Sequence, residues 1–449
     1  MAAARRPPVP PGPLLVVGLE RSGAACARAL WNRGEPLIGV DIGEPQHGEA
    51  LRQEGIEISL KSDGVDELER ARAVVRSPGV PNDAAVLVAA RAAGIPIYSE
   101  LELGWRMLES PFVAVTGTNG KTTTVELLGA IWRAAGREAV VAGNTGTAVS
   151  SLVGQIGPET TVICEASSFQ LEDSVAFDPE VAVLLNIEPD HLDRHGDFDS
   201  YRRAKLELFA FQDEDDYAVG RAAMLKLAGG GARRVTVDLS GDNAAEIELR
   251  DGLICWNGTA LLAASEVRLR GAHNLENALC AAAAALSAGI PGEAVVAALK
   301  SFAGVEHRLE EIGSSEGVLW VNDSKATNVA STIAALAAFE QPLLLIAGGE
   351  AKGQEFAALA EAAATSVRAA FLIGEDAKQI AAAFEGLIDV SRCRSLEEAV
   401  TAAAAAAVEG EIVLLSPACA SFDQFPAGFE QRGQEFRQMV QQLPGFLSI

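Results

Sequence analysis

Residues 113–123, which read VAVTGTNGKTT, decide the fold of this chain. The apolar residues 112–116 predict a buried strand, and a helix is expected to begin at Lys121. Gly117 and Gly120 fall between them. Glycines let backbone N–H groups wrap around a phosphate, and the start of the following helix adds a partial positive charge. The stretch therefore predicts a phosphate-binding loop where a strand gives way to a helix.

Two side chains of this stretch suit the same chemistry. Lys121 can bridge the terminal phosphates of a nucleotide, and the Thr122 hydroxyl can bind magnesium. The spacing departs from the common Walker form, because Val115 stands where its first glycine would be. A plain strand-to-helix turn is the alternative. Two glycines, a lysine and a threonine together at this point favour the phosphate loop.

On both sides of this stretch, short apolar strands alternate with Ala-rich helices. Such alternation predicts an α/β fold with parallel sheets and helices on both faces. The Asp251-Gly252 pair predicts a hairpin turn. The predicted strands are 14–18, 36–40, 73–76, 95–98, 112–116, 161–166, 181–187, 343–347, 370–373 and 412–416, with hairpin strands at 233–237, 246–249, 253–256, 309–312 and 318–321; helices are expected at 24–32, 274–288 and 293–301.

Length and composition limit the classes of protein. The chain has 449 residues, which suggests about three domains. Its 61 acidic and 36 basic residues give a net charge of −25, which excludes a general binder of nucleic acid or anionic membrane. Any phosphate must therefore be bound by local groups. No apolar run reaches the roughly 18 residues of a membrane span.

The six cysteines and the N-terminus indicate the compartment. No two cysteines form a C-x-x-C pair, so we expect reduced thiols in a cytoplasmic protein. The opening residues, MAAARRPPVPPGP, carry two arginines but lack the apolar segment of a signal peptide. We therefore expect no secretory leader.

A second glycine-containing turn, residues 18–23 (GLERSG), follows the first predicted strand, and Asp41 ends the next strand. This spacing resembles the dinucleotide-binding fingerprint. Glu20, however, replaces the middle glycine, where the backbone would approach a pyrophosphate. A nucleotide-diphosphate site is therefore favoured over an NAD site. A tight turn without a ligand is the alternative.

Residues 186–195, NIEPDHLDRH, follow another predicted strand and hold two of the five histidines among carboxylates. Oxygen ligands and an imidazole suit magnesium or manganese bridging a phosphate. Glu165 could complete such a site. A solvated acidic loop and an exposed lone Glu165 are the alternatives. The residues alone indicate an ordinary helix-surface lysine at Lys205, because nothing in them singles it out. An ammonium close to magnesium would be repelled unless its amine were neutral or carbamylated.

Three polar segments follow predicted strands in the last third of the chain: residues 322–328 (NDSKATN), 348–352 (GGEAK) and 416–425 (SPACASFDQF). Their side chains can bind ribose, phosphate or a carboxylate. Capped helix starts are the alternative. Arg308 places a guanidinium at the expected junction between two domains.

These motifs together resemble the Mur ligase family. The likeness runs from the first strand to the C-terminus and also includes residues 143–146 (GNTG), 165–172 (EASSFQLE), 201–205 (YRRAK), 273–278 (HNLENA) and 429–433 (FEQRG). The NDSKATN and SPACAS segments are similar to those of members that add D-glutamate. The resemblance implies three domains: a Rossmann-like UDP-substrate-binding domain at 1–110, a central ATP-binding P-loop domain of the mononucleotide-binding type at 111–304, and a Rossmann-like amino-acid-binding domain at 305–449.

The resemblance also implies an activity. An ATP- and Mg²⁺-dependent ligase would phosphorylate the carboxylate of UDP-N-acetylmuramoyl-L-alanine. The amine of D-glutamate would attack the acyl phosphate, and the tetrahedral intermediate would collapse to an amide, in cytoplasmic peptidoglycan synthesis for cell wall, shape and division. We expect a monomer that binds small molecules and no nucleic acid. The alternatives are another Mur-type or folylpolyglutamate-type ligase, an NAD-dependent oxidoreductase, and a non-catalytic nucleotide-regulated protein.

The resemblance assigns residues to each ligand. ATP would contact Gly117, Thr118, Asn119, Gly120, Lys121, Thr122, Thr123, Asn274, Asn277, Arg308, Asp323 and Lys325. Magnesium would bind Thr122, Glu165, His191 and Lys205, the last if carbamylated; Lys121, Glu165, His191 and Lys205 would be catalytic. The UDP end would contact Leu19, Arg21, Ser22, Asp41 and Ser77, and the muramoyl-alanine part Asn144, Gln170 and His191. D-glutamate would contact Thr327, Lys352, Ser421 and Phe429.

Overall fold

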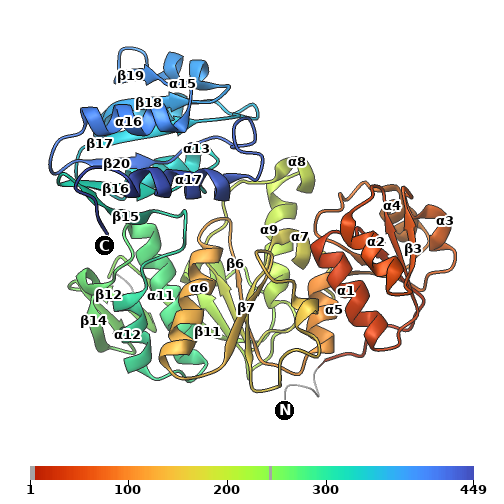
Figure 1. Ribbon diagram of the computed structural model, residues 1–449. Coiled ribbons are helices and arrows are strands. Elements are labelled where there is room, and N and C mark those ends of the chain that lie inside the picture. The colour runs from red at the N-terminus through yellow and green to blue at the C-terminus, as the bar shows by residue number, and fades with distance from the viewer. Residues whose placement is uncertain (1–5, 242–244, 449) are drawn as a thin grey trace. The chain divides into compact units, whose positions relative to one another are not determined.

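The computed structural model describes residues 6–241 and 245–448 (Figure 1). The described residues fall into two compact units. One is drawn from Met1–Glu266 and Glu276–Ser301, and the other from Val267–Leu275 and Phe302–Ile449. All six cysteines are free thiols. Within the described ranges, no helix combines the length and apolar character that crossing a bilayer requires.

The first part of the larger unit is a parallel sheet with the strand order β3-β2-β1-β4-β5. Alternate side chains of β1 enter different cores: Leu14 and Val16 pack on one face, and Leu15 and Val17 on the other. Both faces are therefore covered, as predicted. The elements are β1 (Leu14–Val17), α1 (Arg21–Asn32), β2 (Leu37–Asp41), α2 (Gln46–Gln53), β3 (Glu57–Leu60), α3 (Val65–Leu68), β4 (Ala73–Arg76), α4 (Ala85–Ala92), β5 (Ile97–Ser99) and α5 (Glu100–Met107).

The second part of this unit is a nine-stranded sheet with the order β14-β13-β12-β11-β10-β9-β6-β8-β7. Strand β6 is wholly buried and pairs in parallel with β8 and β9. The elements are β6 (Phe112–Thr116), α6 (Lys121–Ala134), β7 (Ala139–Gly143), η2 (Val149–Leu152), β8 (Thr161–Glu165), α7 (Ser168–Leu171), β9 (Val181–Leu184), α8 (Leu192–His195), α9 (Phe198–Leu206), η3 (Glu207–Phe209), β10 (Tyr217–Gly220), α10 (Ala222–Leu225), β11 (Arg233–Asp238), β12 (Ile247–Arg250), β13 (Leu253–Trp256), β14 (Thr259–Ala263), η4 (Ala264–Glu266), α11 (Ala272–Ser287) and α12 (Gly292–Ser301).

The hairpin predicted around Asp251-Gly252 is confirmed, because β12 and β13 pair antiparallel across that turn. The assignment of residues 233–237 to hairpin material is wrong. Strand β11 instead pairs in parallel with both β10 and β12, so it extends the parallel sheet. The sequence did not indicate this because β10, its neighbour, was not among the predicted strands.

The smaller unit contains a seven-stranded sheet with the order β19-β18-β17-β20-β16-β15-β21. The predicted hairpin of β15 and β16 is antiparallel, whereas β16, β20, β17, β18 and β19 run parallel. The elements are β15 (Glu310–Ser315), β16 (Val318–Asn322), α13 (Val329–Leu336), β17 (Leu343–Gly348), α14 (Ala357–Ser366), β18 (Val367–Ile373), α15 (Ala377–Phe384), β19 (Asp389–Arg392), α16 (Leu396–Ala406), β20 (Ile412–Leu415), α17 (Phe429–Gln441) and β21 (Leu447–Ser448).

Ligands of open parallel sheets bind beyond the carboxyl ends of the strands, where the connections diverge to opposite sides. In the first sheet this point lies between β1 and β4, and in the second it lies around β6. The glycine turn of residues 18–23 and the phosphate loop of residues 117–120 follow these strands directly. The fold thus places both predicted loops where ligands bind.

Candidate active site

The phosphate loop connects β6 to α6 through a left-handed glycine. Gly120 has a φ of +85°, and a Cβ added there would lie 2.3 Å from Oδ1 of Asn277. No larger residue fits without displacing the Asn277 side chain. Lys121 Nζ donates hydrogen bonds to the carbonyls of Gly117 at 2.9 Å and Thr118 at 3.0 Å. The lysine therefore folds back over the loop, and the Asn277 side chain lies beside Gly120, while their roles in binding ATP stay predictions.

Neighbouring segments hold this loop in shape. The backbone N–H of Thr118 donates to the Asn186 carbonyl at 3.0 Å, and that of Asn119 donates to Asn186 Oδ1 at 2.8 Å. Thr118 Oγ1 lies 2.9 Å from the Tyr201 hydroxyl. We did not predict these roles of Asn186 and Tyr201. The position of Asn186, just after the buried strand β9 that pairs with β6, is the feature of the sequence that could have indicated its role.

Glu165 ends β8 with its side chain buried, not exposed as a lone glutamate would suggest. Its Oε2 accepts a hydrogen bond from Thr122 Oγ1 at 2.7 Å. Its Oε1 accepts one from Asn144 Nδ2 and one from Thr145 Oγ1, each at 2.9 Å. The structure therefore brings Thr122, Glu165 and Asn144 together, and it adds Thr145, which we did not predict.

Lys205 is not the surface lysine that the residues alone suggested. Helix α9 buries its side chain to 2% exposure. Its Nζ donates to the Gly117 carbonyl at 2.7 Å and lies 4.6 Å from the centre of the Tyr201 ring. Burial, followed by the nearby Lys121 ammonium, lowers the pKa of Lys205 to about 6. The amine is therefore mostly uncharged at neutral pH, the form that can react with carbon dioxide.

The predicted magnesium ligands are brought together only in part. The Thr122 hydroxyl and the Glu165 carboxylate touch, and two such oxygens suit a hard cation. His191 is exposed, has a left-handed φ of 51° and lies 3.5 Å from Asp190. Within residues 6–241 and 245–448, no three His, Cys, Asp or Glu side chains gather as a metal site. The oxygens of Thr122 and Glu165 fit a magnesium ion, and the assignment of all four residues as its ligands stays a prediction.

Gln170 caps the first turn of α7 through its side-chain oxygen, and its side-chain nitrogen has no hydrogen-bond partner. Its Oε1 accepts hydrogen bonds from the backbone N–H of Ser167 at 3.1 Å and from Ser167 Oγ at 2.9 Å, so a capping box fixes the side chain. Its Nε2 is buried with no hydrogen-bond partner. A buried donor without a partner is unfavourable unless a ligand completes it. This supports the predicted contact of Gln170 with a substrate.

The glycine turn after β1 is closed by two side chains. Asp41 accepts from the backbone N–H of Leu19 at 2.6 Å and of Gly43 at 2.7 Å. Ser77 Oγ donates to the Gly18 carbonyl at 2.7 Å. The Leu19 side chain is buried in the core, so only its backbone can face a ligand. Of the other two predicted residues, Arg21 is exposed and Ser22 is half-buried at the start of α1.

In the smaller unit, Asp323 is buried after β16. Its carboxylate accepts from Ser416 Oγ at 2.8 Å and from the Leu309 N–H at 3.2 Å. Burial raises the pKa of Asp323 to about 7. Lys325 Nζ lies 3.8 Å from the centre of the Phe429 ring, so two residues predicted for different substrates adjoin. Asp323 thus links three segments of the predicted ATP- and amino-acid-binding edge.

The remaining predicted residues follow β16, β17 and β20 or belong to α11. Lys352 is exposed with a left-handed φ of 52°, and its Nζ lies 5.3 Å from the centre of the Phe422 ring. A non-glycine residue in that conformation is strained, and such strain gathers at functional sites. Ser421 is buried and Thr327 half-buried. Asn274 Nδ2 donates to the Arg270 carbonyl at 2.9 Å.

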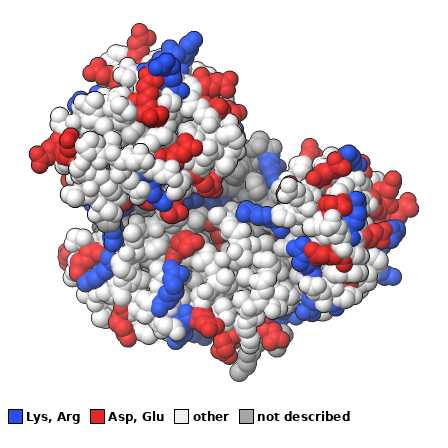
Figure 2. Space-filling model, in the orientation of Figure 1, with Lys and Arg blue, Asp and Glu red and all other residues white. Residues whose placement is uncertain are grey.

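The charge of the chain is not concentrated at one place on the face shown in Figure 2. Acidic and basic side chains are interspersed there among uncharged surface, although the net charge is −25. A global field that repels phosphate therefore has to be overcome locally. We expect the Lys121 ammonium and the N–H groups at the start of α6 to supply that local attraction.

Comparison with known proteins agrees with this geometry. The Mur ligase middle domain matches residues 115–285, its glutamate ligase domain residues 307–419, and the MurD-like N-terminal domain residues 13–99. A UDP-N-acetylmuramoylalanine–D-glutamate ligase of Pelotomaculum thermopropionicum is 41% identical over 96% of this chain and 97% of its own. The chain belongs to the Mur ligase family. A ligase of the same name from Anaeromyxobacter dehalogenans is 42% identical to this Mur ligase over 95% of the chain and 96% of its own.

Solved structures share the fold of this Mur ligase. The UDP-N-acetylmuramate–alanine ligase of Thermotoga maritima has a TM-score of 0.59 at 20% identity and covers 95% of this chain and 99% of its own. The MurF ligase of the same organism, in complex with ADP, has a TM-score of 0.57 at 18% identity and covers 90% and 94%. The predicted α/β fold is confirmed, whereas the domain limits at 110 and 304 stay predictions.

Proposed function

We propose that this Mur ligase joins D-glutamate to UDP-N-acetylmuramoyl-L-alanine with the hydrolysis of ATP. One observation carries the proposal: the loop after β6 folds Lys121 over itself and pairs Thr122 with a buried Glu165, in a chain whose near-full-length relatives bear that ligase name. Those parts suit phosphoryl transfer to a carboxylate. They have no use in hydride transfer.

The chemistry explains why a triphosphate is needed. A carboxylate is a poor electrophile, so one of its oxygens first attacks the γ-phosphorus of ATP, and the bond to the β-phosphate oxygen breaks to release ADP. The neutral amine of D-glutamate then attacks the carbonyl carbon of the acyl phosphate. The tetrahedral intermediate expels inorganic phosphate, and the amine proton passes to solvent. Phosphoryl transfer needs neutralised charge more than covalent help.

The residues of the larger unit act on the phosphates and the acid. Lys121 and the loop N–H groups stabilise charge on the β- and γ-phosphates. Bound magnesium would add positive charge between ATP and the acid, with Thr122, Glu165, His191 and Lys205 as its ligands. Lys205 serves as a ligand if its neutral amine attacks carbon dioxide and loses a proton, which gives a carbamate. Partial rescue of an inactive Lys205→Ala variant by a small carboxylate would support this role.

The remaining assignments follow the three ligands. The UDP end contacts the turn closed by Asp41 and Ser77, with Leu19, Arg21 and Ser22. Asn144, Gln170 and His191 contact the muramoyl-alanine part, and the unpartnered Nε2 of Gln170 supports this. ATP is also bound by Asn274, Asn277, Arg308, Asp323 and Lys325. D-glutamate is bound by Thr327, Lys352, Ser421 and Phe429, with the Lys352 ammonium paired to one carboxylate.

We also propose that the enzyme uses ATP with Mg²⁺, that it acts as a monomer in the cytoplasm, and that residues 1–110, 111–304 and 305–449 are its three domains. A UDP-linked precursor and ATP are both cytoplasmic metabolites, which supports that compartment. Sedimentation of the purified protein at assay concentration tests the monomer, because a dimer would double the sedimenting mass.

The test is a phosphate-release assay over a grid of amines and acids. D-glutamate, L-glutamate and meso-diaminopimelate are each combined with UDP-N-acetylmuramoyl-L-alanine and with a folate, in the presence of ATP and Mg²⁺. We expect phosphate only when D-glutamate and the muramoyl acceptor are present together. Release only with a folate or with meso-diaminopimelate would contradict the assigned substrates while leaving the ligase chemistry in place.

A further inference from the structure

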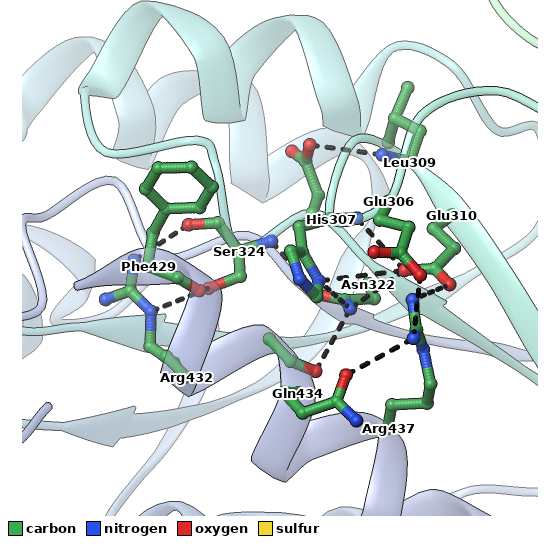
Figure 3. A network of polar contacts seen from close by, with 12 residues as sticks. Glu306, His307, Leu309, Glu310, Asn322, Ser324, Phe429, Arg432, Gln434 and Arg437 are labelled. Carbon is green, nitrogen blue, oxygen red and sulfur yellow. Dashed lines mark hydrogen bonds and ion pairs between the residues drawn. The ribbon is translucent and has the colours of Figure 1, made fainter. Parts of the chain in front are cut away.

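Helix α17 carries a fully buried arginine, Arg432, whose guanidinium contacts three segments at the carboxyl edge of the smaller sheet. Figure 3 shows its contact with one of them, at Ser324. Arg432 Nε donates to Ser324 Oγ at 3.0 Å, and its Nη2 donates to the Ser324 carbonyl at 2.9 Å. Both Nη atoms donate to the Cys419 carbonyl at 3.3 Å. A longer contact of 3.4 Å reaches the Gly348 carbonyl. One planar group thus connects segments that follow β16, β17 and β20.

The same three segments carry the residues proposed to bind D-glutamate. Ser324 precedes Thr327, Gly348 precedes Lys352, and Cys419 precedes Ser421. The last two segments are also joined directly, because Glu350 and Ala420 exchange backbone hydrogen bonds of 3.0 Å. Ser324 Oγ further donates to the Phe429 carbonyl at 2.8 Å, which ties the start of α17 to the first segment. Arg432 therefore contacts the segments that carry the proposed D-glutamate-binding residues, without being one of those residues itself.

A second arginine of α17 contacts a different segment. Arg437 Nη1 donates to Glu306 Oε1 at 3.0 Å, and its Nη2 forms an ion pair with Glu310 (Figure 3). These two glutamates flank the turn that contains Arg308. Both ion pairs lie within the smaller unit, and Arg437 is largely shielded from solvent, with 18% of its side chain exposed.

That turn is strained and held from several sides. His307 and Leu309, on either side of Arg308, both have left-handed φ values, of 63° and 46°. Glu310 Oε2 accepts from the His307 N–H at 3.0 Å, and Asn322 Nδ2 lies 2.8 Å from His307 Nδ1. Strained residues persist only where their surroundings determine the conformation. The glutamate paired with Arg437 is one of those surroundings.

We propose that Arg432 and Arg437 are positioning residues for two different substrates: Arg432 aligns the segments that receive D-glutamate, and Arg437 fixes the turn that presents Arg308 to ATP. The inference rests on the proposed function for the identity of the substrates. The contacts of the two arginines are separate, so the effects of replacing them should be separate too.

The test compares Arg432→Lys with Arg437→Gln. A lysine ammonium is a single point and cannot span the oxygens that a planar guanidinium contacts. For Arg432→Lys we expect the KM for D-glutamate to rise about tenfold or more, with the KM for ATP changed by less than about threefold. For Arg437→Gln we expect the KM for ATP to rise about tenfold or more and the KM for D-glutamate to change by less than about threefold. Arg368→Gln is the matched control, because Arg368 forms a comparable ion pair with Glu411 in the same unit, and both KM values should stay unchanged.

Two further measurements keep the outcomes distinct. Ser324→Ala removes one acceptor of Arg432 and should raise the KM for D-glutamate in the same direction, so it replaces Arg432→Lys if that variant does not fold. ADP affinity, measured by calorimetry with Mg²⁺, should fall for Arg437→Gln and not for Arg432→Lys, whatever the acceptor substrate is. If the wild type releases no phosphate with D-glutamate, the proposed function fails, and the ADP result still decides the role of Arg437. Equal changes in both KM values, or a loss of thermal stability with neither KM changed, would overturn the inference.

Discussion

Replacing Lys205 with methionine should stabilise the protein while abolishing its activity. The side chain is buried, and its pKa is lowered from 10.5 to about 6, first by burial and then by Lys121. At a pH between these two pKa values, the Lys205 amine is mostly neutral in the folded protein and mostly protonated in the unfolded protein. The unfolded state therefore binds more protons, and this lysine destabilises the fold.

The magnitude follows from the two pKa values. Each pH unit below the unfolded pKa adds about 1.4 kcal/mol to the penalty, so at about pH 7.5 it amounts to about 4 kcal/mol. The penalty is greatest below pH 6 and disappears as the pH rises to 10.5. Methionine removes the penalty but loses the hydrogen bond to Gly117, which contributes about 1 kcal/mol. We therefore expect a net gain of about 3 kcal/mol at about pH 7.5 and almost none at about pH 9.5.

The assay is urea unfolding of the wild type and of Lys205→Met, followed by intrinsic fluorescence across this pH range in buffer free of carbon dioxide. Lys226→Met is the control, because Lys226 is exposed in the same unit, and its effect should be small and independent of pH. The stability of the wild type should rise with pH toward that of the variant. A variant that is less stable than the wild type at every pH would refute the account of Lys205 as a desolvated amine.

Other predictions concern the phosphate loop and the amino-acid site. Lys121→Ala should reduce phosphate release by more than about a hundredfold, because a fixed cation at the γ-phosphate is lost; activity within about tenfold would show that the loop is not the phosphate site. Gly120→Ala should weaken ADP binding in calorimetry, because φ is +85° and the new Cβ would meet Asn277. Gly136→Ala, at φ +65° in open space, controls for strain alone and should leave binding intact. Lys352→Ala should raise the KM for D-glutamate about tenfold, and an effect on ATP alone would contradict its assignment.

The sequence predicted the elements whose signals are local. Strand β6 and the start of α6 are confirmed, because an apolar run, two glycines and a lysine mark that boundary in the chain itself. The hairpin of β12 and β13 is confirmed for the same reason. Strands β3, β7, β10, β14, β19 and β21 were missed. They are short, and pairing with neighbouring strands determines them more than their own residues do.

At the candidate site, the sequence failed mainly to predict which single polar side chains are buried. Glu165 and Lys205 have no local feature that distinguishes them from exposed residues, and only packing of β8 and α9 around the phosphate loop buries them. The residues alone suggested only that Glu165 could complete a metal site, and the predicted role of Lys205 came from the resemblance to the family. The same holds for Arg432, whose place inside the smaller unit depends on segments that follow three different strands.

The central claim is that the loop after β6 binds the phosphates of ATP. A crystal structure of the protein with ADP and Mg²⁺ tests it most directly. We expect the β-phosphate within hydrogen-bond distance of the N–H groups of Gly120, Lys121 and Thr122. Nucleotide bound only at the glycine turn of residues 18–23, with the loop after β6 unoccupied in the presence of saturating ADP, would contradict it.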